Sequence, residues 1–538
     1  MAEQPELLPS ANGIPSDDLL TIPSGNWRGG REFDDLFLST SDGIVDRGRP
    51  NSLSRDKHIL IIGGGVSGLL VAWMLLDRGY QVTILAKDWA WTKDFQGSRI
   101  TSQIAGALWE MPPGGCGLTE IAEERQGYAN LKDYQQWAIQ SYEFYCDYAK
   151  LASPHEKGGW SLGLKIADLH QFFYEDIFSG QGMATNHYKK YDIMQRDATK
   201  FGTKKYSNHD EIISYTEGFR GNTIFDANYR GGFQSAYTHK APILNTDKAL
   251  AYLMALVERK GATLETREVK DLYANGQELL NDFGAQVIVN ATGLGSKELV
   301  GDNDVYPVRG AIRRVENTRR SQFRHLNDAY LVPAQKGPDE KPTKTVFIVP
   351  RNDDILYVGS IIQPNNWTLN LTEESPEVQQ MWDRAGDFMP SLRHAGFVNH
   401  FPFAQGLRPF TKNNAKVRAD EKARFPLVHN YGHGGSGWTL GIGTARCAVD
   451  IVEGLLLNTR AEEINRGIYE ATPEADTSEV DAGAAAVDAC KGAEHALKAA
   501  AAAKDPNNAA QARQHAAAAK AALTAAAESF SQLALRGT

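Results

Sequence analysis

The sequence predicts an α/β fold that ends in a helical appendix, and three observations lead to this prediction. A strand-like run at His58–Ile62 is followed by a glycine-rich turn, an apolar helical pattern at Leu69–Leu76 and a second strand-like run at Gln81–Leu85. This order is typical of a parallel-sheet unit. Apolar and polar residues alternate over residues 305–365, as they do in an antiparallel sheet. Alanine, the best helix former, dominates from residue 479 onward.

Length and composition narrow the class of protein. The chain has 538 residues, enough for two or three domains with buried cores, and its content of 42% hydrophobic and 23% charged residues is ordinary for a globular protein. The net charge of -9 and the lack of a Lys/Arg block argue against nucleic acid as a partner. The sequence contains no apolar run of about 18 residues, the length that would suggest a membrane span. Four scattered cysteines argue against a metal site or a disulfide framework.

The ends of the chain differ from its middle in composition. Residues 1–56 are rich in Pro, Gly, Ser and Asp, which predicts an extended N-terminal arm, and their start lacks the apolar segment of a signal peptide. We therefore expect a cytoplasmic protein, and the sequence leaves a homo-oligomer open. A linker is expected over 459–478, followed by an Ala-rich helical hairpin over 479–538 with its turn at Asp505–Asn508. The hairpin either docks on the body or another subunit or forms a detached tail.

The remaining elements follow in order along the middle of the chain. Residues 128–150 predict a helix, and its aromatic stripe is assigned to the core. Residues 155–240 predict an irregular segment with short strand-like pieces. Further on, the sequence predicts a helix at Asp247–Arg259, strands at Thr263–Val269, Gln286–Asn290, Ala329–Val332, Thr345–Val349 and Ile355–Ile361, a helix at 376–396, and loop, glycine-rich turn and final helix over 401–457.

The turn after the first strand carries the strongest motif. Gly63, Gly65 and Gly68 form a Gly-x-Gly-x-x-Gly pattern between a strand and a helix, which is the context of a Rossmann-type dinucleotide-binding unit. Gly63 permits the tight turn, Gly65 lets backbone amides approach a pyrophosphate, and Gly68 lets the helix pack close to the strand. The phosphates would lie at the positive N-terminus of the helix.

The motif does not choose between NAD and FAD. The acidic residue that commonly binds the ribose at the end of the second strand is replaced by Ala86, followed by Lys87 and Asp88. The ribose would therefore be held by Asp88, by Lys87 or by backbone.

Two later segments add small residues and glycines that suit a bound ring. Thr101–Trp109 contains hydroxyl and small residues shortly after the second strand. His429–Leu440 places a glycine run before the final helix, and free amides at a helix N-terminus suit an electron-rich group.

Taken together, the chain resembles the D-amino acid oxidase family of FAD-dependent amine oxidases over roughly residues 57–458. The resemblance is carried by an ordered set of segments, namely Gly63–Gly68, Ala86-Lys87-Asp88, Ala105–Trp109, Val289–Gly293, Pro307–Gly310, Gly406–Pro409 and His429–Thr439. It implies a Rossmann-type FAD-binding domain, made of parts 57–110, 245–300 and 403–458, interleaved with an antiparallel-sheet substrate domain, made of parts about 150–240 and 301–402.

The resemblance also implies roles for individual residues. Arg408 would pair with the substrate α-carboxylate, a task that suits the planar guanidinium, and the carbonyl of Gly435 would accept from the substrate amine. Val269 would meet the adenine through its backbone. The other implied FAD contacts are Gly63, Gly65, Val66, Ser67, Gly68, Lys87, Asp88, Thr101, Ser102, Gly106, Ala107, Leu108, Gly434, Gly435, Gly437, Trp438 and Thr439.

Two departures from the family pattern concern the substrate. The tyrosine that helps to hold the carboxylate is replaced by Phe347, and the tyrosine of the active-site lid is absent near Thr343 in the long lid Pro333–Lys344. A hydrogen bond to a charged group contributes about 1.5–3 kcal/mol, so binding of a simple amino acid should weaken by about tenfold or more unless Tyr330, Tyr357 or another residue replaces the lost hydroxyl.

The implied function is FAD-dependent oxidative deamination of D-amino acids to 2-oxo acids, with release of ammonia and, through dioxygen, hydrogen peroxide. The alternative is a flavin-dependent amine oxidase or dehydrogenase acting on a larger amino-acid-derived or natural-product substrate, as Phe347 suggests. A different class, a flavin-binding scaffold, is disfavoured because Arg408 and the glycine loop are present. Arg309, Arg313 and Arg314 are candidates for binding an acidic side chain, and His429 and His433 are expected to pack rather than to act as acid or base.

Overall fold

We describe the protein from a computed structural model that covers residues 56–90, 99–113, 128–152, 162–207, 210–212, 232–319, 323–336, 342–343, 345–352, 354–399 and 401–469. Residues 1–55 of the expected arm and the expected Ala-rich hairpin lie outside these ranges. The chain divides into two compact units, Met1–Asn465 and Arg466–Thr538. The elements described below belong to the first unit, except for the end of α13 (Ala461–Tyr469), which begins where the linker was expected.

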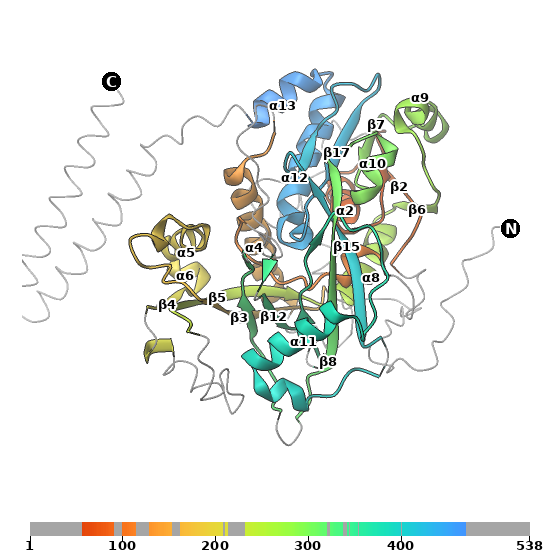
Figure 1. Ribbon diagram of the computed structural model, residues 1–538. Helices are drawn as coiled ribbons and strands as arrows, with labels where there is room; N and C mark the ends of the chain where they lie inside the picture. Colours follow the sequence, from red (N-terminus) through yellow and green to blue (C-terminus); the bar gives the residue numbers. More distant parts are fainter. Residues whose placement is uncertain are drawn as a thin grey trace, which may run out of the picture. The chain divides into compact units, whose positions relative to one another are not determined.

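A six-stranded sheet within the described ranges is almost entirely parallel (Figure 1). Its order is β16-β17-β7-β1-β2-β6, and only β16 and β17 pair antiparallel. Parallel sheets are covered on both faces, which explains the apolar runs in these strands. The strands are β1 (His58–Ile62), β2 (Gln81–Ala86), β6 (Thr263–Thr266), β7 (Val287–Asn290), β16 (Lys416–Ala419) and β17 (Leu427–Tyr431).

Alternate residues of β1 point to opposite faces of the sheet, and helices pack against both faces. Leu60 packs in one core with Leu272 and Leu279 of α9 (Leu272–Phe283). On the other face, a Cβ at Gly68 would lie 3.4 Å from Ile61, so α2 (Val66–Asp77) packs closely there. The remaining helices around the sheet are α4 (Leu131–Ala152), α8 (Thr246–Arg259), α10 (Ser296–Leu299) and α12 (Gly437–Leu456), and α12 contacts both α2 and α4.

A second sheet of nine strands is mainly antiparallel, with the order β14-β8-β13-β12-β9-β3-β5-β4 and β15 paired to β8. Helix α11 (Pro376–Phe388) lies across it in Figure 1, and Phe388 of α11 shares a core with Ile348 and Val358. The strands are β3 (Leu164–Phe173), β4 (Lys204–Tyr206), β5 (Ser235–Leu244), β8 (Val305–Glu316), β9 (Ala329–Val332), β12 (Val346–Pro350), β13 (Ile355–Gly359), β14 (Gln363–Pro364) and β15 (Phe403–Thr411). Short elements outside both sheets are α3 (Thr101–Ile104), α5 (Asn186–Arg196), α6 (Ala198–Phe201) and the β10–β11 pair (Gln335–Lys336, Pro342–Thr343).

The predicted α/β class is confirmed, and so are the predicted strands β1, β2, β7, β9, β12 and β13 within one or two residues. Two expectations are wrong. Residues 155–240 contain the ten-residue strand β3 and the start of the ten-residue strand β5, and these two strands pair along their whole length. Residues 401–457 begin with β15, β16 and β17 rather than with a loop. Pro409 obscured β15 in the sequence, and it is tolerated because β15 pairs only with β8 at the edge of this sheet.

The prediction of a helix over 376–396 is correct only for its first part, because α11 ends at Phe388 and a 3₁₀ turn follows at Pro390–His394. Among the helices that the structure describes, none is long and apolar enough to cross a membrane.

Candidate active site

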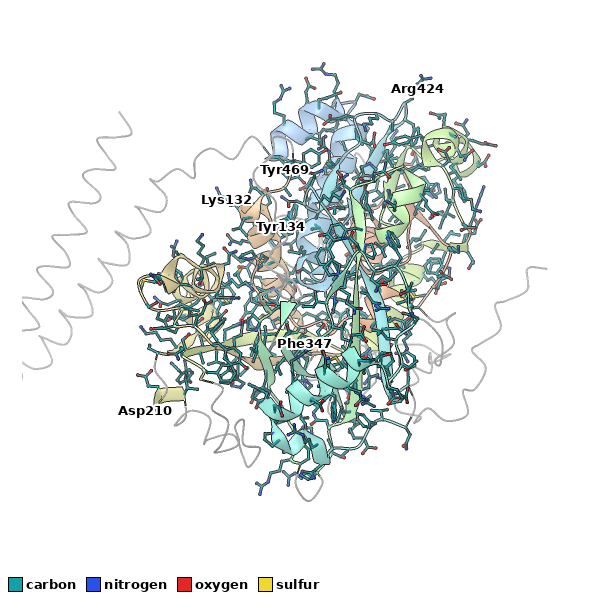
Figure 2. All side chains as sticks on the ribbon, viewed as in Figure 1. Lys132, Tyr134, Asp210, Phe347, Arg424 and Tyr469 are labelled. Carbon is teal, nitrogen blue, oxygen red and sulfur yellow. The ribbon has the colours of Figure 1, made fainter. Side chains whose placement is uncertain are left out.

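A cavity of about 1020 Å³ lies between the two sheets. One side is formed by the residues that follow the carboxyl ends of β1, β2, β6 and β7, which is where open parallel sheets bind their ligands. The other side is formed by residues of β8, β12 and β15, including Phe347, which Figure 2 labels on β12. The topology therefore brings a nucleotide-binding edge and an antiparallel sheet to the same cavity.

The glycine turn after β1 has the packing that the motif predicts. Gly63 has φ +121°, and a Cβ there would lie 2.4 Å from the carbonyl oxygen of Ala291. A Cβ at Gly68 would lie 2.0 Å from the carbonyl oxygen of Gly63. These two glycines therefore let the turn, α2 and the end of β7 pack against one another, while Gly65 at the N-cap of α2 lines the cavity.

The segment Thr101–Leu108 is bonded to the N-termini of two helices that border the cavity, α2 and α12. The Ser102 hydroxyl accepts from the backbone N–H of Val66 at 3.2 Å, in the first turn of α2. The indole N–H of Trp438, in the first turn of α12, donates to the Ser102 carbonyl at 3.0 Å. Two positive helix ends therefore meet one loop, an arrangement that suits a ligand carrying phosphates and an electron-rich ring.

The end of the cavity near β2 and β6 carries an ion pair that the sequence did not reveal. Lys87 donates to Glu268 at 2.7 Å, and Glu268 follows β6 beside Val269. Lys87, Asp88, Glu268 and Val269 all line the cavity. Glu268 thus places an acidic side chain at this end of the cavity, where Ala86 offers none.

Arg408 projects from β15 into the cavity with its guanidinium in a fixed position. Its Nη1 donates to the Ile361 carbonyl at 3.0 Å and its Nη2 donates to the Ser360 hydroxyl at 2.7 Å. The guanidinium lies over Gly310 of β8, where a Cβ would be 2.2 Å from Nη1. A guanidinium offers five N–H donors in one plane, so a preset fork remains for a carboxylate ligand.

Phe347 lines the same cavity as Arg408 but offers only an apolar ring. A Cβ at Gly106 would be 2.5 Å from its Cζ, so the ring packs against the loop that follows α3. Neither proposed replacement for the missing hydroxyl reaches the cavity, because Tyr330 stacks on His170 at 5.0 Å and Tyr357 lies under Arg351. That part of the expectation is corrected.

The two histidines of the glycine-rich block hold elements together, as expected for packing residues. His433 connects Ser67 of α2 to Asn430 of β17, at 3.4 and 3.1 Å, and burial lowers the pKa of its imidazole to about 4. His429 is bonded to Asp420 at 2.8 Å and does not line the cavity. His433 lines the cavity, and its role in packing rather than in proton transfer stays a prediction.

The three arginines considered for an acidic side chain are engaged elsewhere. Arg309 bonds to Gln363, Thr368 and Asn370. Arg313 pairs with Glu373 and stacks on Phe397, and Arg314 donates to the carbonyl of Phe401. None of the three lines the cavity.

Of all the residues assigned to the site from the sequence, only Gly68 does not line the cavity. Sequence reasoning missed Glu268 and Ser360, because no motif marks them. Gly310 belonged to a quoted motif, but its function as the seat of Arg408 depends on the pairing of β8 with β15. Across the ranges that the structure describes, no group of three or more His, Cys, Asp or Glu side chains is arranged to hold a metal ion.

The fold and the cavity are those expected of an FAD-dependent oxidoreductase, and the family comparison agrees. The family model described as FAD dependent oxidoreductase, DAO, matches residues 58–451. The chain belongs to this DAO family, and the cofactor is FAD. The resemblance inferred from the sequence motifs is thereby confirmed.

Individual relatives place the chain at a moderate distance from characterised oxidases. It is 28% identical over 388 residues to the D-amino-acid oxidase of Rubrobacter xylanophilus, covering 72% of this chain and 93% of that protein. It is 26% identical over 408 residues to the D-amino-acid oxidase of Schizosaccharomyces pombe, covering 73% and 95%. Glycine oxidase from Bacillus cereus is similar in fold, with a TM-score of 0.52 at 17% identity and coverage of 76% and 98%.

Proposed function

We propose that the protein oxidises D-amino acids to 2-oxo acids, ammonia and hydrogen peroxide, with dioxygen as the electron acceptor. The observation that carries this proposal is the seating of Arg408, whose guanidinium is held over Gly310 by Ser360 and Ile361 at the cavity wall. The D-amino-acid oxidases named above support it by their sequence similarity. We propose the cytoplasm as its location on the composition of the chain alone.

The residues present fit FAD. Glycines at 63 and 65 leave room for a backbone approach, α2 directs its N-terminus toward the cavity, and Lys87, Glu268 and Val269 lie where a ribose and an adenine would be held. The division into FAD-binding and substrate-binding parts is part of this proposal, with β15 contributing to the substrate side through its pairing with β8. When bound, FAD would supply the two-electron acceptor for oxidation at the substrate α-carbon.

The side chains of this site orient the substrate rather than transfer protons. Arg408 binds the α-carboxylate, the carbonyl of Gly435 accepts from the α-amine, and Phe347 excludes water from that side of the cavity. Such positioning can lower a barrier by several kcal/mol, about 7–11 kcal/mol in the best intramolecular cases. No side-chain base is required for the C–H step.

The proposal is tested by mixing oxidised protein anaerobically with a panel of D- and L-amino acids and following the flavin absorption band. We expect particular D-amino acids to bleach the band and their L-isomers to leave it unchanged. Bleaching by L-isomers alone, or by no free amino acid, would contradict the proposal.

A second candidate is an amine oxidase or dehydrogenase that acts on a larger amino-acid-derived substrate. Phe347 favours it, because an apolar ring contacts an apolar substrate body better than a free carboxylate. In the same experiment, a yellow protein that is bleached by no free amino acid but by an N-substituted or extended amine would favour this candidate.

A further inference from the structure

The same cavity has a polar wall that the proposed chemistry does not use. This wall is lined by Glu110, which follows the loop of Gly106, by Glu175 just beyond the end of β3, and by His187 and Lys190 of α5. Residues 107–109 run beside β5, with the N–H of Trp109 bonded to the Pro242 carbonyl at 2.9 Å. Glu110 is four residues beyond Gly106, so their Cα atoms are at most about 14 Å apart.

Lys190 and Glu110 form a largely buried pair at this wall. The Lys190 ammonium donates to Oε1 of Glu110 at 2.5 Å, and the two side chains are 4% and 16% exposed. Both residues line the cavity, and the ammonium is the more deeply buried partner. A carboxylate has two acceptor oxygens, so Oε2 remains available to a donor on the ligand.

The charges that face the ligand at this wall are therefore mainly negative. Glu175 forms no ion pair with any residue in the described ranges, while the charge of Lys190 is balanced by Glu110. His187 adds no positive charge at neutral pH, because burial and the nearby Lys190 lower the pKa of its imidazole to about 4. The three arginines that an acidic side chain would need are bonded outside the cavity.

We propose that this wall selects D-amino acids whose side chain ends in a cation, an ammonium or a guanidinium, with Glu110 as the main specificity-determining residue and Glu175 as a second carboxylate. The inference rests on the proposed function, since it places the α-carboxylate at Arg408 and the far end of the side chain at Glu110. A buried charge is stable only when it is paired, so a cationic end would be favoured over an apolar one and an anionic end would be disfavoured.

Binding without turnover provides the first test. 6-Aminohexanoate carries the carboxylate and the terminal ammonium of lysine without its α-amine, and hexanoate lacks the ammonium. We expect 6-aminohexanoate to perturb the absorption of the bound flavin at a concentration about tenfold or more below that required for hexanoate, as one charge-assisted hydrogen bond predicts. Equal affinities, or binding of neither compound, would overturn the proposal.

Variants of the wall residues test whether Glu110 and Glu175 cause the tighter binding of 6-aminohexanoate. Glu110→Gln keeps an oxygen for Lys190 but removes the negative charge, so the affinity ratio of the two compounds should fall by about tenfold. Glu175→Gln should lower it less. Glu278→Gln, which removes one exposed carboxylate on α9, serves as the matched control and should leave the ratio unchanged. An unchanged ratio in Glu110→Gln would assign the preference elsewhere and refute the role of Glu110.

Turnover separates this inference from the proposed function. We compare kcat/KM for D-lysine and for D-norleucine, which has a methyl group in place of the terminal aminomethyl group, and expect D-lysine to be preferred. A protein that oxidises D-norleucine better than D-lysine would be a D-amino acid oxidase without this specificity. If the protein oxidises neither amino acid but still binds 6-aminohexanoate more tightly than hexanoate, the cationic subsite is supported and the proposed reaction is refuted.

Discussion

At the scale of single residues, the position of the Arg408 guanidinium depends on the absence of a side chain at Gly310. Gly310 has no Cβ, so the guanidinium can lie flat on β8, and Ser360 and the Ile361 carbonyl hold it there. An arginine that is already ordered loses little side-chain entropy when a ligand binds. If Arg408 binds the substrate carboxylate as proposed, the absence of a side chain at Gly310 contributes to that affinity by allowing the guanidinium to take this position.

Gly310→Ala tests this dependence. A Cβ at position 310 would lie 2.2–2.5 Å from three guanidinium atoms, all at the end of a flexible side chain, so Arg408 should move while the sheet stays intact. We expect KM for an oxidised D-amino acid to rise about tenfold with little change in thermal stability or FAD content. Gly180→Ala is the control, because a Cβ there meets no atom within 4 Å. A KM unchanged by Gly310→Ala would mean that the seat over β8 is not required for binding.

At the scale of elements, the loop that carries Thr101 and Gly106 is held by one carboxylate of α8. Asp247 accepts from Arg99 and Arg351, each at 2.8 Å, and from Gln103 at 3.3 Å. Thr246 adds a bond from its hydroxyl to the Gln103 carbonyl at 2.6 Å. Burial would raise the pKa of Asp247, but Arg351 and Arg99 outweigh it and lower that pKa.

Asp247→Asn should loosen this loop. Arg351, whose side chain is 1% exposed, would lose its carboxylate partner, and breaking a buried ion pair destabilises by about 3–5 kcal/mol. Asp247 itself is 30% exposed, so we expect a loss near the lower end, about 3 kcal/mol, together with weaker retention of FAD. Chemical denaturation and FAD titration measure the two effects. Asp387→Asn breaks an exposed pair with Arg393 and should change stability by at most about 1 kcal/mol; a similarly small effect of Asp247→Asn would contradict the anchoring role.

The elements also show how far the sequence alone could lead. The unit from β1 to β2 was predictable, since its glycines, apolar runs and breaks all indicate one structure. Strand β17 was not, because His429 and Asn430 interrupt its apolar pattern; they are buried only because Asp420, Asn290 and His433 bond to them. Likewise, the partners of Arg408 come from β8 and from the turn after β13, and no local pattern reveals such long-range pairing.

At the scale of the whole molecule, two buried imidazoles and one half-buried imidazole make stability depend on pH. Burial lowers the pKa values of His187, His239 and His433 from 6.5 to about 4. They lie in α5, in β5 and just after β17, so the effect is shared by both sheets. In the unfolded chain these groups bind protons near pH 6.5, whereas in the folded chain they do so only near pH 4.

The sign follows from proton linkage. Between pH 6.5 and pH 4 the unfolded chain binds more protons, so this contribution to the free energy of unfolding is complete above pH 6.5 and is lost as the pH falls toward 4. We expect the denaturant midpoint to decrease steeply across this range. His239→Gln should flatten the slope, because His239 is fully buried and bonds to the carbonyl of Lys240, whereas replacement of the exposed His394 by Gln should not. Midpoints that stay constant from pH 7 to pH 4.5, or a slope that His239→Gln leaves unchanged, would show that other groups set the acid stability of this protein.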